Sequence, residues 1–117
     1  GVGRCDFGGE PKVLYKTFAE QIFTLSDDVR IFPGHDYIQN NLEFTLDREP
    51  DNQSALDLRT EFSQGLDAES FVSTIGIERE INVFFRLDQA QVRAGIGVSA
   101  VDDQATFIGL RALRDNW

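Results

Sequence analysis

The stretch Leu25–Tyr37, LSDDVRIFPGHDY, holds the only histidine of the chain and its clearest strand signal. Val29–Phe32 is short and apolar, and Pro33 and Gly34 follow it, so the pattern predicts a β-strand that ends in a tight loop. His35 comes just after the carboxyl end of that strand, the edge at which α/β layers usually bind ligands. A lone histidine is more often structural or merely exposed, so the role of His35 depends on the rest of the chain.

Composition indicates one modest soluble domain. The chain has 117 residues, of which 41% are hydrophobic and 26% are charged, an ordinary balance for a globular protein. The net charge of −9 argues against nucleic acid or an anionic membrane as a partner, because both need clustered lysines and arginines. No apolar run approaches the roughly 18 residues that cross a bilayer. The single cysteine, Cys5, cannot form an internal disulfide, which fits a cytoplasmic location.

Three helices are predicted in the first half of the chain. Over residues 10–25 apolar residues recur at three- and four-residue spacing, and Pro11 suits the first helical position. Two more helices are expected at 39–48 and 53–64, the second closed by Gly65. Residues 1–9 are glycine-rich and read as loop, in a Gly-x-Gly-Arg pattern typical of the middle of an active-site loop. We therefore expect the chain to be a fragment.

The second half is less regular. Helical turns capped by Asp67 or Ser73 are expected to run to about residue 82, and residues 83–87 (VFFRL) fit either a helix end or a buried strand. Residues 88–100 are weakly patterned and suggest a loop or a glycine-broken strand. A last helix is expected to begin at Asp102 or Asp103. Its expected inward side chains are Phe107, Leu110 and Leu113, with Arg111 and Arg114 near its end.

The strand at 29–32 needs a partner, because one strand cannot form a sheet alone. Partner strands are expected within residues 1–9 or 83–99, or in another polypeptide segment.

Four motifs follow one another in a fixed order: GVGRCDF (1–7), PGHDY (33–37), NNLEFTLDREPDN (40–52) and STIGIEREINVFFR (73–86). Together they resemble the C-terminal half of a metallo-β-lactamase-fold hydrolase, in particular the glyoxalase II (hydroxyacylglutathione hydrolase) branch. The resemblance implies an α+β fold: the C-terminal half of an αββα sandwich, mostly helices with a few short strands. Residues 1–117 would be a partial domain, in which 88–117 form a C-terminal packing segment.

The resemblance also implies roles for four residues. His35 matches a ligand of the family's two-metal site, which is usually zinc and sometimes iron or manganese, and a neutral imidazole on a rigid loop suits these metals. Arg4 and Tyr37 match residues that contact the glutathione part of the substrate. Arg86 matches an arginine that holds a substrate carboxylate, a task that guanidinium groups perform bidentately.

The remaining metal ligands of the family lie upstream of Gly1. Because one histidine cannot build a two-metal site, we expect this chain alone to be inactive and to need the missing N-terminal half. Its apolar faces would be only partly covered, which favours a homodimer of the isolated chain.

The function implied by the resemblance is metal-dependent hydrolysis of a thioester by the intact protein. Glutathione-linked thioesters are one candidate class of substrate. Two alternatives stay open. Asp6 and Phe7 resemble the GR-x-DF pattern of persulfide dioxygenases, a mononuclear iron branch of the same fold, and Asp88 and Gln89 stand where basic residues often bind glutathione. The missing ligands and the acidic charge also fit a non-catalytic domain that binds a partner protein.

Overall fold

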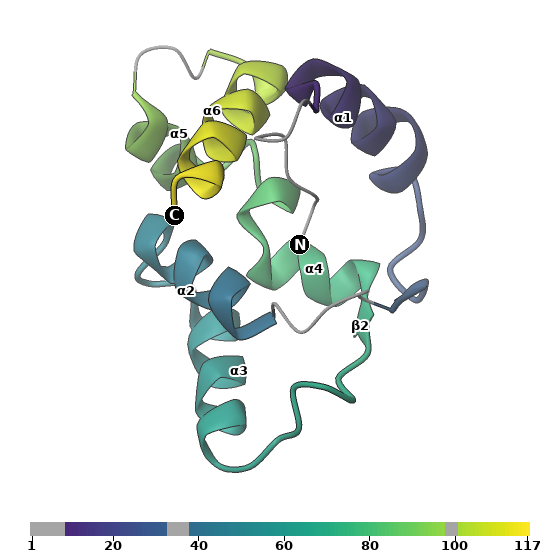
Figure 1. The fold of residues 1–117 in the computed structure, drawn as a ribbon, viewed down its shortest axis with the longest axis vertical. Coiled ribbons are helices and arrows are strands. Elements are labelled where there is room, and N and C mark those ends of the chain that lie inside the picture. The colour runs from purple at the N-terminus through teal and green to yellow at the C-terminus, as the bar shows by residue number, and fades with distance from the viewer. Residues whose placement is uncertain (1–8, 33–37, 98–100) are drawn as a thin grey trace. The chain divides into compact units, whose positions relative to one another are not determined.

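The computed structural model describes residues 9–32, 38–97 and 101–117 (Figure 1). They divide into two compact units. The first unit is Ser26–Asn82, and the second combines the described residues up to Leu25 with Val83–Trp117. None of the helices in the described ranges is long and apolar enough to span a membrane. The expectation of an α+β chain made mostly of helices, with short strands, is confirmed.

The first unit is built from helices around a small sheet. Its described elements are β1 (Arg30–Ile31), α2 (Ile38–Arg48), α3 (Gln53–Ser63), β2 (Ser73–Thr74) and α4 (Ile75–Ile81). All three helices contribute to an apolar core formed by Leu42, Leu46, Ala55, Phe62 and Ile81. The helices expected at 39–48 and 53–64 are confirmed, because their apolar residues do recur on one buried face.

The end of α3 follows its sequence signal closely. Gly65 has a φ of 111°, a backbone conformation that glycine adopts without a steric cost. The Gly65 N–H donates to the carbonyl of Phe62 at 3.2 Å, and the Leu66 N–H donates to that of Glu61 at 3.0 Å. This pair of bonds is a Schellman motif, which satisfies carbonyls that the helix leaves without partners.

The sheet corrects the sequence-based expectation for β1. β1 pairs antiparallel with β2, so that Arg30 lies opposite Thr74 and Ile31 lies opposite Ser73. The described partner therefore comes from a segment that was expected to be helical, and not from residues 83–99. Two residues are too few to show a period of two, so this pairing leaves no readable pattern in the sequence.

The cap of α4 was also placed wrongly. Neither Asp67 nor Ser73 caps this helix; the Thr74 hydroxyl does, by accepting from the N–H of Ile77 at 3.1 Å. The N–H of Gly76 donates to the carbonyl of Asp27 at 2.9 Å. A Cβ at position 76 would lie 3.1 Å from the Cβ of Asp27, so this close approach explains the glycine inside the helix.

The second unit is built around aromatic side chains. Its described elements are α1 (Pro11–Thr17), the π-helix η1 (Phe18–Ile22), the 3₁₀ turn η2 (Val83–Phe85), α5 (Ala90–Ile96) and α6 (Asp103–Asp115). Pro11 does start the first helix. The helix expected over residues 10–25 ends in π geometry, in which the Phe23 N–H donates to the carbonyl of Phe18 at 2.8 Å.

Helix α5 was missed in the sequence, where residues 88–100 were read as loop or broken strand. It buries one side chain fully, Val92, with Ile96 half-buried four residues later. Two apolar positions in seven residues are too few for a readable helical period. The helix then ends at Gly97, which has a φ of 105°.

Helix α6 begins where expected but faces the core differently. Asp102 caps it, accepting from the Ala105 N–H at 2.8 Å. Phe107 and Leu110 are fully buried as predicted, whereas Leu113 is 38% exposed. Arg111, which was expected only to lie near the helix end, is 2% exposed. The buried face of α6 therefore includes Arg111 and not Leu113. A pattern of apolar residues cannot predict this, because arginine is not apolar.

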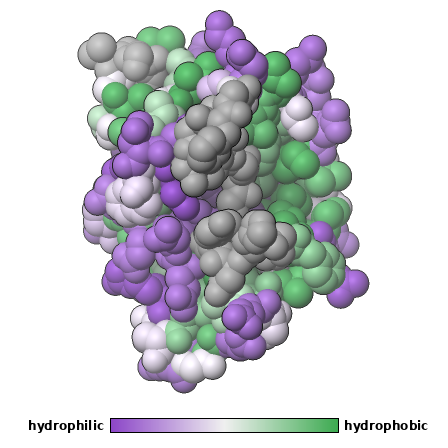
Figure 2. All heavy atoms as spheres, viewed as in Figure 1, coloured by the Kyte–Doolittle hydropathy of each residue, from purple (hydrophilic) through white to green (hydrophobic). Residues whose placement is uncertain are grey.

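Large apolar side chains reach the surface in both units. Figure 2 shows hydrophobic side chains among hydrophilic ones on the face that it draws. Phe32, at the end of the β1 segment, is 68% exposed. The others are Val13, Leu66, Val72, Val101, Leu113 and Trp117. Among the described residues, apolar side chains are thus exposed in both units.

Candidate functional site

Arg86 is the one predicted site residue that the structure describes; Arg4, His35 and Tyr37 lie outside the described residues. Arg86 follows η2, and its N–H donates to the carbonyl of Val83 at 3.0 Å. Val83 and Leu87 are 1% and 4% exposed, whereas Arg86 itself is half-buried. The backbone at Arg86 is thus anchored on both sides by buried residues.

Aromatic rings fix the turn that precedes Arg86. The ring of Phe84 meets that of Phe107 on α6 edge-on, with 5.3 Å between centroids. The ring of Phe85 meets Phe23 at 5.4 Å and Phe18 at 5.9 Å, again edge-on. Pairs in this geometry are worth about 0.5–1.5 kcal/mol each beyond the area that they bury. Within the segment 83–87, which was left open between helix end and strand, Val83–Phe85 therefore form a 3₁₀ turn inside an aromatic core.

Arg111 lies beneath the same turn. Its Cζ is 5.4 Å from the centroid of the Phe84 ring, within the range of a cation–π interaction. Its Nη2 and Nε donate to Oδ1 of Asp115 at 2.9 and 3.0 Å. A guanidinium that is 2% exposed needs such partners to offset its desolvation. The i,i+4 spacing of Arg111 and Asp115 is the one sequence signal that could have identified the pair.

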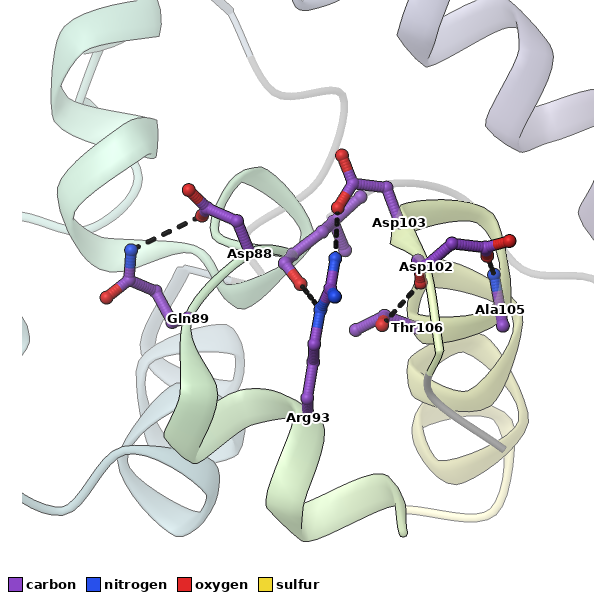
Figure 3. A network of polar contacts seen from close by, with 8 residues as sticks. Asp88, Gln89, Arg93, Asp102, Asp103, Ala105 and Thr106 are labelled. Atoms are coloured by element: carbon purple, nitrogen blue, oxygen red, sulfur yellow. Dashed lines mark hydrogen bonds and ion pairs between the residues drawn. The ribbon is translucent and has the colours of Figure 1, made fainter. Parts of the chain in front are cut away.

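A second arginine, Arg93 on α5, contacts the residue after Arg86. Its Nε donates to the carbonyl of Leu87 at 2.8 Å, and its Nη2 donates to Oδ1 of Asp103 at 2.6 Å (Figure 3). In the same view the hydroxyl of Thr106 donates to the carbonyl of Asp102 at 2.7 Å. One guanidinium therefore joins the segment after Arg86 to the start of α6.

Asp88 and Gln89 follow Arg86 on the surface. Both are exposed, and the Gln89 amide donates to the Asp88 carboxylate at 3.3 Å. The two positions at which the family often has basic residues therefore carry an acidic and a neutral side chain, which are hydrogen-bonded to each other. Arg93 follows them on α5, and its Nε and Nη2 donate to the Leu87 carbonyl and to Asp103.

A groove of about 480 Å³ lies along α1 and η1. Its lining residues are Lys12, Val13, Tyr15, Lys16, Ala19, Glu20 and Gln104. Burial raises the pKa of the Tyr15 hydroxyl, and the carboxylates of Asp103 and Asp102 raise it further. The ring of Tyr15 packs edge-on against that of Phe107 with 5.5 Å between centroids. Tyr15 is therefore a neutral, structural tyrosine at neutral pH, and the groove mixes both signs of charge.

Metal ligands do not gather in the described part of the chain. Across residues 9–32, 38–97 and 101–117 there is no group of three or more His, Cys, Asp or Glu side chains that could hold a metal ion. A zinc site normally needs three or four protein ligands. The described residues by themselves therefore do not fit a metal centre.

Comparison with known proteins identifies relatives along the whole chain. The family profile described as hydroxyacylglutathione hydrolase C-terminus matches residues 36–117. A hydroxyacylglutathione hydrolase of Nitrosococcus oceani is 44% identical over 123 residues, covering 100% of this chain and 47% of the relative. Proteins of the same name from Polaromonas sp. and Anaeromyxobacter dehalogenans are 43% and 36% identical, covering 100% and 98% of this chain. The chain spans about half the length of the curated relatives it matches.

Proposed function

Because this chain belongs to the hydroxyacylglutathione hydrolase family and matches its C-terminal region, we propose that it forms the C-terminal part of a metal-dependent thioester hydrolase. The proposed substrate is a glutathione thioester of a hydroxy acid, the class in the relatives' name. In this proposal residues 1–117 are a partial metallo-β-lactamase-like domain, an upstream half completes it, and the enzyme works in the cytoplasm. We call the completed protein the full-length enzyme.

The observation that carries the proposal is the 44% identity over all of this chain to a protein of that name. It favours the hydrolase over an acidic partner-binding domain, because the similarity to proteins named as hydrolases extends over the whole of this chain. The GR-x-DF pattern keeps a persulfide dioxygenase as the second candidate.

His35 is proposed as one ligand of a divalent metal, with the other ligands upstream. The family is metal-dependent, and zinc is the proposed metal, with iron and manganese as alternatives. The metal would supply Lewis-acid chemistry at the thioester carbonyl. Since the described residues hold no metal centre, the role proposed for them is in substrate binding.

Arg86 is proposed to bind a carboxylate of the glutathione part of the substrate. Its half-buried position and its anchored backbone support this role, since a guanidinium held at a fixed place loses little entropy when it pairs with a carboxylate. Arg4 and Tyr37 are proposed to contact the same part of the substrate. None of these groups would take part in bond breaking, so their loss should weaken binding more than turnover.

Thiol release from S-lactoylglutathione by the full-length enzyme tests the proposal. Wild type should hydrolyse the thioester, His35→Ala should abolish activity and metal binding, and Arg86→Ala and Arg4→Ala should each raise KM more than they lower kcat. The isolated 117-residue chain should be inactive and should bind zinc weakly in calorimetry. Oxygen consumption on glutathione persulfide without thioester hydrolysis would instead assign the dioxygenase function.

A further inference from the structure

The backbone at Arg86 is held from two directions. Upstream, the Arg86 N–H closes the η2 turn onto the carbonyl of Val83 at 3.0 Å. Downstream, the carbonyl of Leu87 accepts from the Nε of Arg93 at 2.8 Å, and the Leu87 side chain is 4% exposed. A hydrogen bond from Arg93 therefore holds the backbone one residue after Arg86.

Arg93 is itself anchored at its other end. Its Nη2 donates to Asp103, the first residue of α6, at 2.6 Å, and the two side chains are 31% and 52% exposed. The stick view shows the guanidinium of Arg93 pointing toward Asp103 (Figure 3), while its Nε donates to the Leu87 carbonyl. Two different nitrogens of one planar group thus fix the segment after Arg86 relative to α6, and all of these residues belong to the second unit.

We propose that Arg93 is a positioning residue for substrate binding: by tying the Leu87 carbonyl to Asp103, it holds the backbone from which Arg86 reaches the substrate carboxylate. The inference rests on the proposed function of Arg86. A bidentate pair tolerates little displacement of its guanidinium, and small misplacements of a binding group can be costly. In this proposal Arg93 acts through the Leu87 carbonyl and the Asp103 carboxylate, to which its Nε and Nη2 donate.

The chemistry of the link requires arginine. A lysine carries all of its donors on one atom, whereas the guanidinium presents Nε and Nη2 in a fixed fork toward two acceptors. Arg93→Lys keeps the positive charge but can replace the two bonds only partly. It therefore separates the effect of the charge from the effect of the geometry.

Steady-state kinetics on S-lactoylglutathione with the full-length enzyme tests the inference. Arg93→Gln should raise KM roughly threefold to tenfold, the range expected for one partly exposed, charge-assisted hydrogen bond, while kcat changes less than about twofold. Arg93→Lys and Asp103→Asn should raise KM by less. Arg59→Gln is the matched control, since Arg59 forms an exposed pair with Glu43 at 3.5 Å in the first unit and should leave KM unchanged.

The double variant Arg86→Ala/Arg93→Gln distinguishes the possible outcomes. If Arg93 acts through Arg86, the double variant should have the KM of Arg86→Ala alone. If Arg86→Ala raises KM but Arg93→Gln and Arg93→Lys do not, or if the two effects multiply, the positioning role is overturned while the proposed function stands. If Arg86→Ala leaves KM unchanged, the proposed role of Arg86 is lost and the inference with it. A melting temperature measured for each variant identifies any loss of folding. If Arg93→Gln does not fold, the KM of the milder variant Arg93→Lys decides whether Arg93 has the positioning role.

Discussion

Removing the side chain of Asn52 should loosen the start of α3 and its link to α4. Asn52 lies in the EPDN motif and is 9% exposed. Its Oδ1 accepts from the N–H of Ala55 at 3.0 Å, which caps α3. Its Nδ2 donates to the carbonyl of Glu80 near the end of α4 at 2.8 Å. One amide therefore makes two hydrogen bonds that different substitutions can remove separately.

The expected cost is about 2 kcal/mol for Asn52→Ala. Loss of an N-cap costs about 1 kcal/mol, and loss of a hydrogen bond to a part-buried carbonyl costs about 1 kcal/mol more. Asn52→Ser keeps a capping oxygen but has no donor that reaches Glu80, so it should cost about 1 kcal/mol. Asn40→Ala is the matched control, because Asn40 is exposed on α2 and its replacement should change stability by less than about 0.5 kcal/mol.

Amide hydrogen exchange in the full-length enzyme measures this effect locally. The Ala55 amide should exchange on the order of 30-fold faster in Asn52→Ala and roughly 5-fold faster in Asn52→Ser, if exchange occurs by opening of this region. Urea denaturation should show the same ranking. The reasoning is refuted if Asn52→Ala behaves like Asn40→Ala, or if Asn52→Ser is as damaging as Asn52→Ala.

Three further predictions concern the second unit. A Cβ at Gly109 would lie 2.6 Å from Cγ2 of Ile96. Gly109→Ala should therefore lower the free energy of unfolding by about 1 kcal/mol, measured by urea denaturation, although alanine has the better helix propensity. A gain in stability would contradict the close approach of α5 and α6. Arg111→Met should lower the free energy of unfolding by about 2–4 kcal/mol, because it leaves Asp115 without its partner. Arg111→Met/Asp115→Leu should recover most of that loss. An equal loss in both variants would show that packing, and not charge, determines stability at this position. The pKa of Tyr15 is raised by burial and nearby carboxylates. Its stabilising contribution is therefore present below the ordinary tyrosine pKa of about 10 and is lost as pH rises through the higher folded-state value. Tyr15→Phe should flatten the fall in melting temperature above about pH 10, and an unchanged slope would contradict the raised pKa.

Helix boundaries could be predicted from the sequence where they depend on residues close to them in the chain. Pro11 at the start of α1, the beginning of α6 at Asp102 or Asp103 and the end of α3 at Gly65 were all predicted from the sequence. Each of these signals acts within about five residues, because capping and periodicity are properties of one or two helical turns. The motifs were also sufficient to identify the family to which the chain belongs.

Tertiary structure alone decided the features whose partners lie far along the chain. β2 is a strand because Ser73 and Thr74 meet β1 some forty residues earlier in the chain, and two residues carry no period of their own. Arg111 is buried because Phe84 and Asp115 receive its guanidinium, although an arginine at a helix end normally faces water. Arg93 contributes to the candidate site because α5 carries it to the Leu87 carbonyl and α6 brings Asp103 to meet it. The sequence by itself therefore determined the family and the candidate residue Arg86, whereas the contacts that hold Arg86 in place depend on distances between segments that no local pattern records.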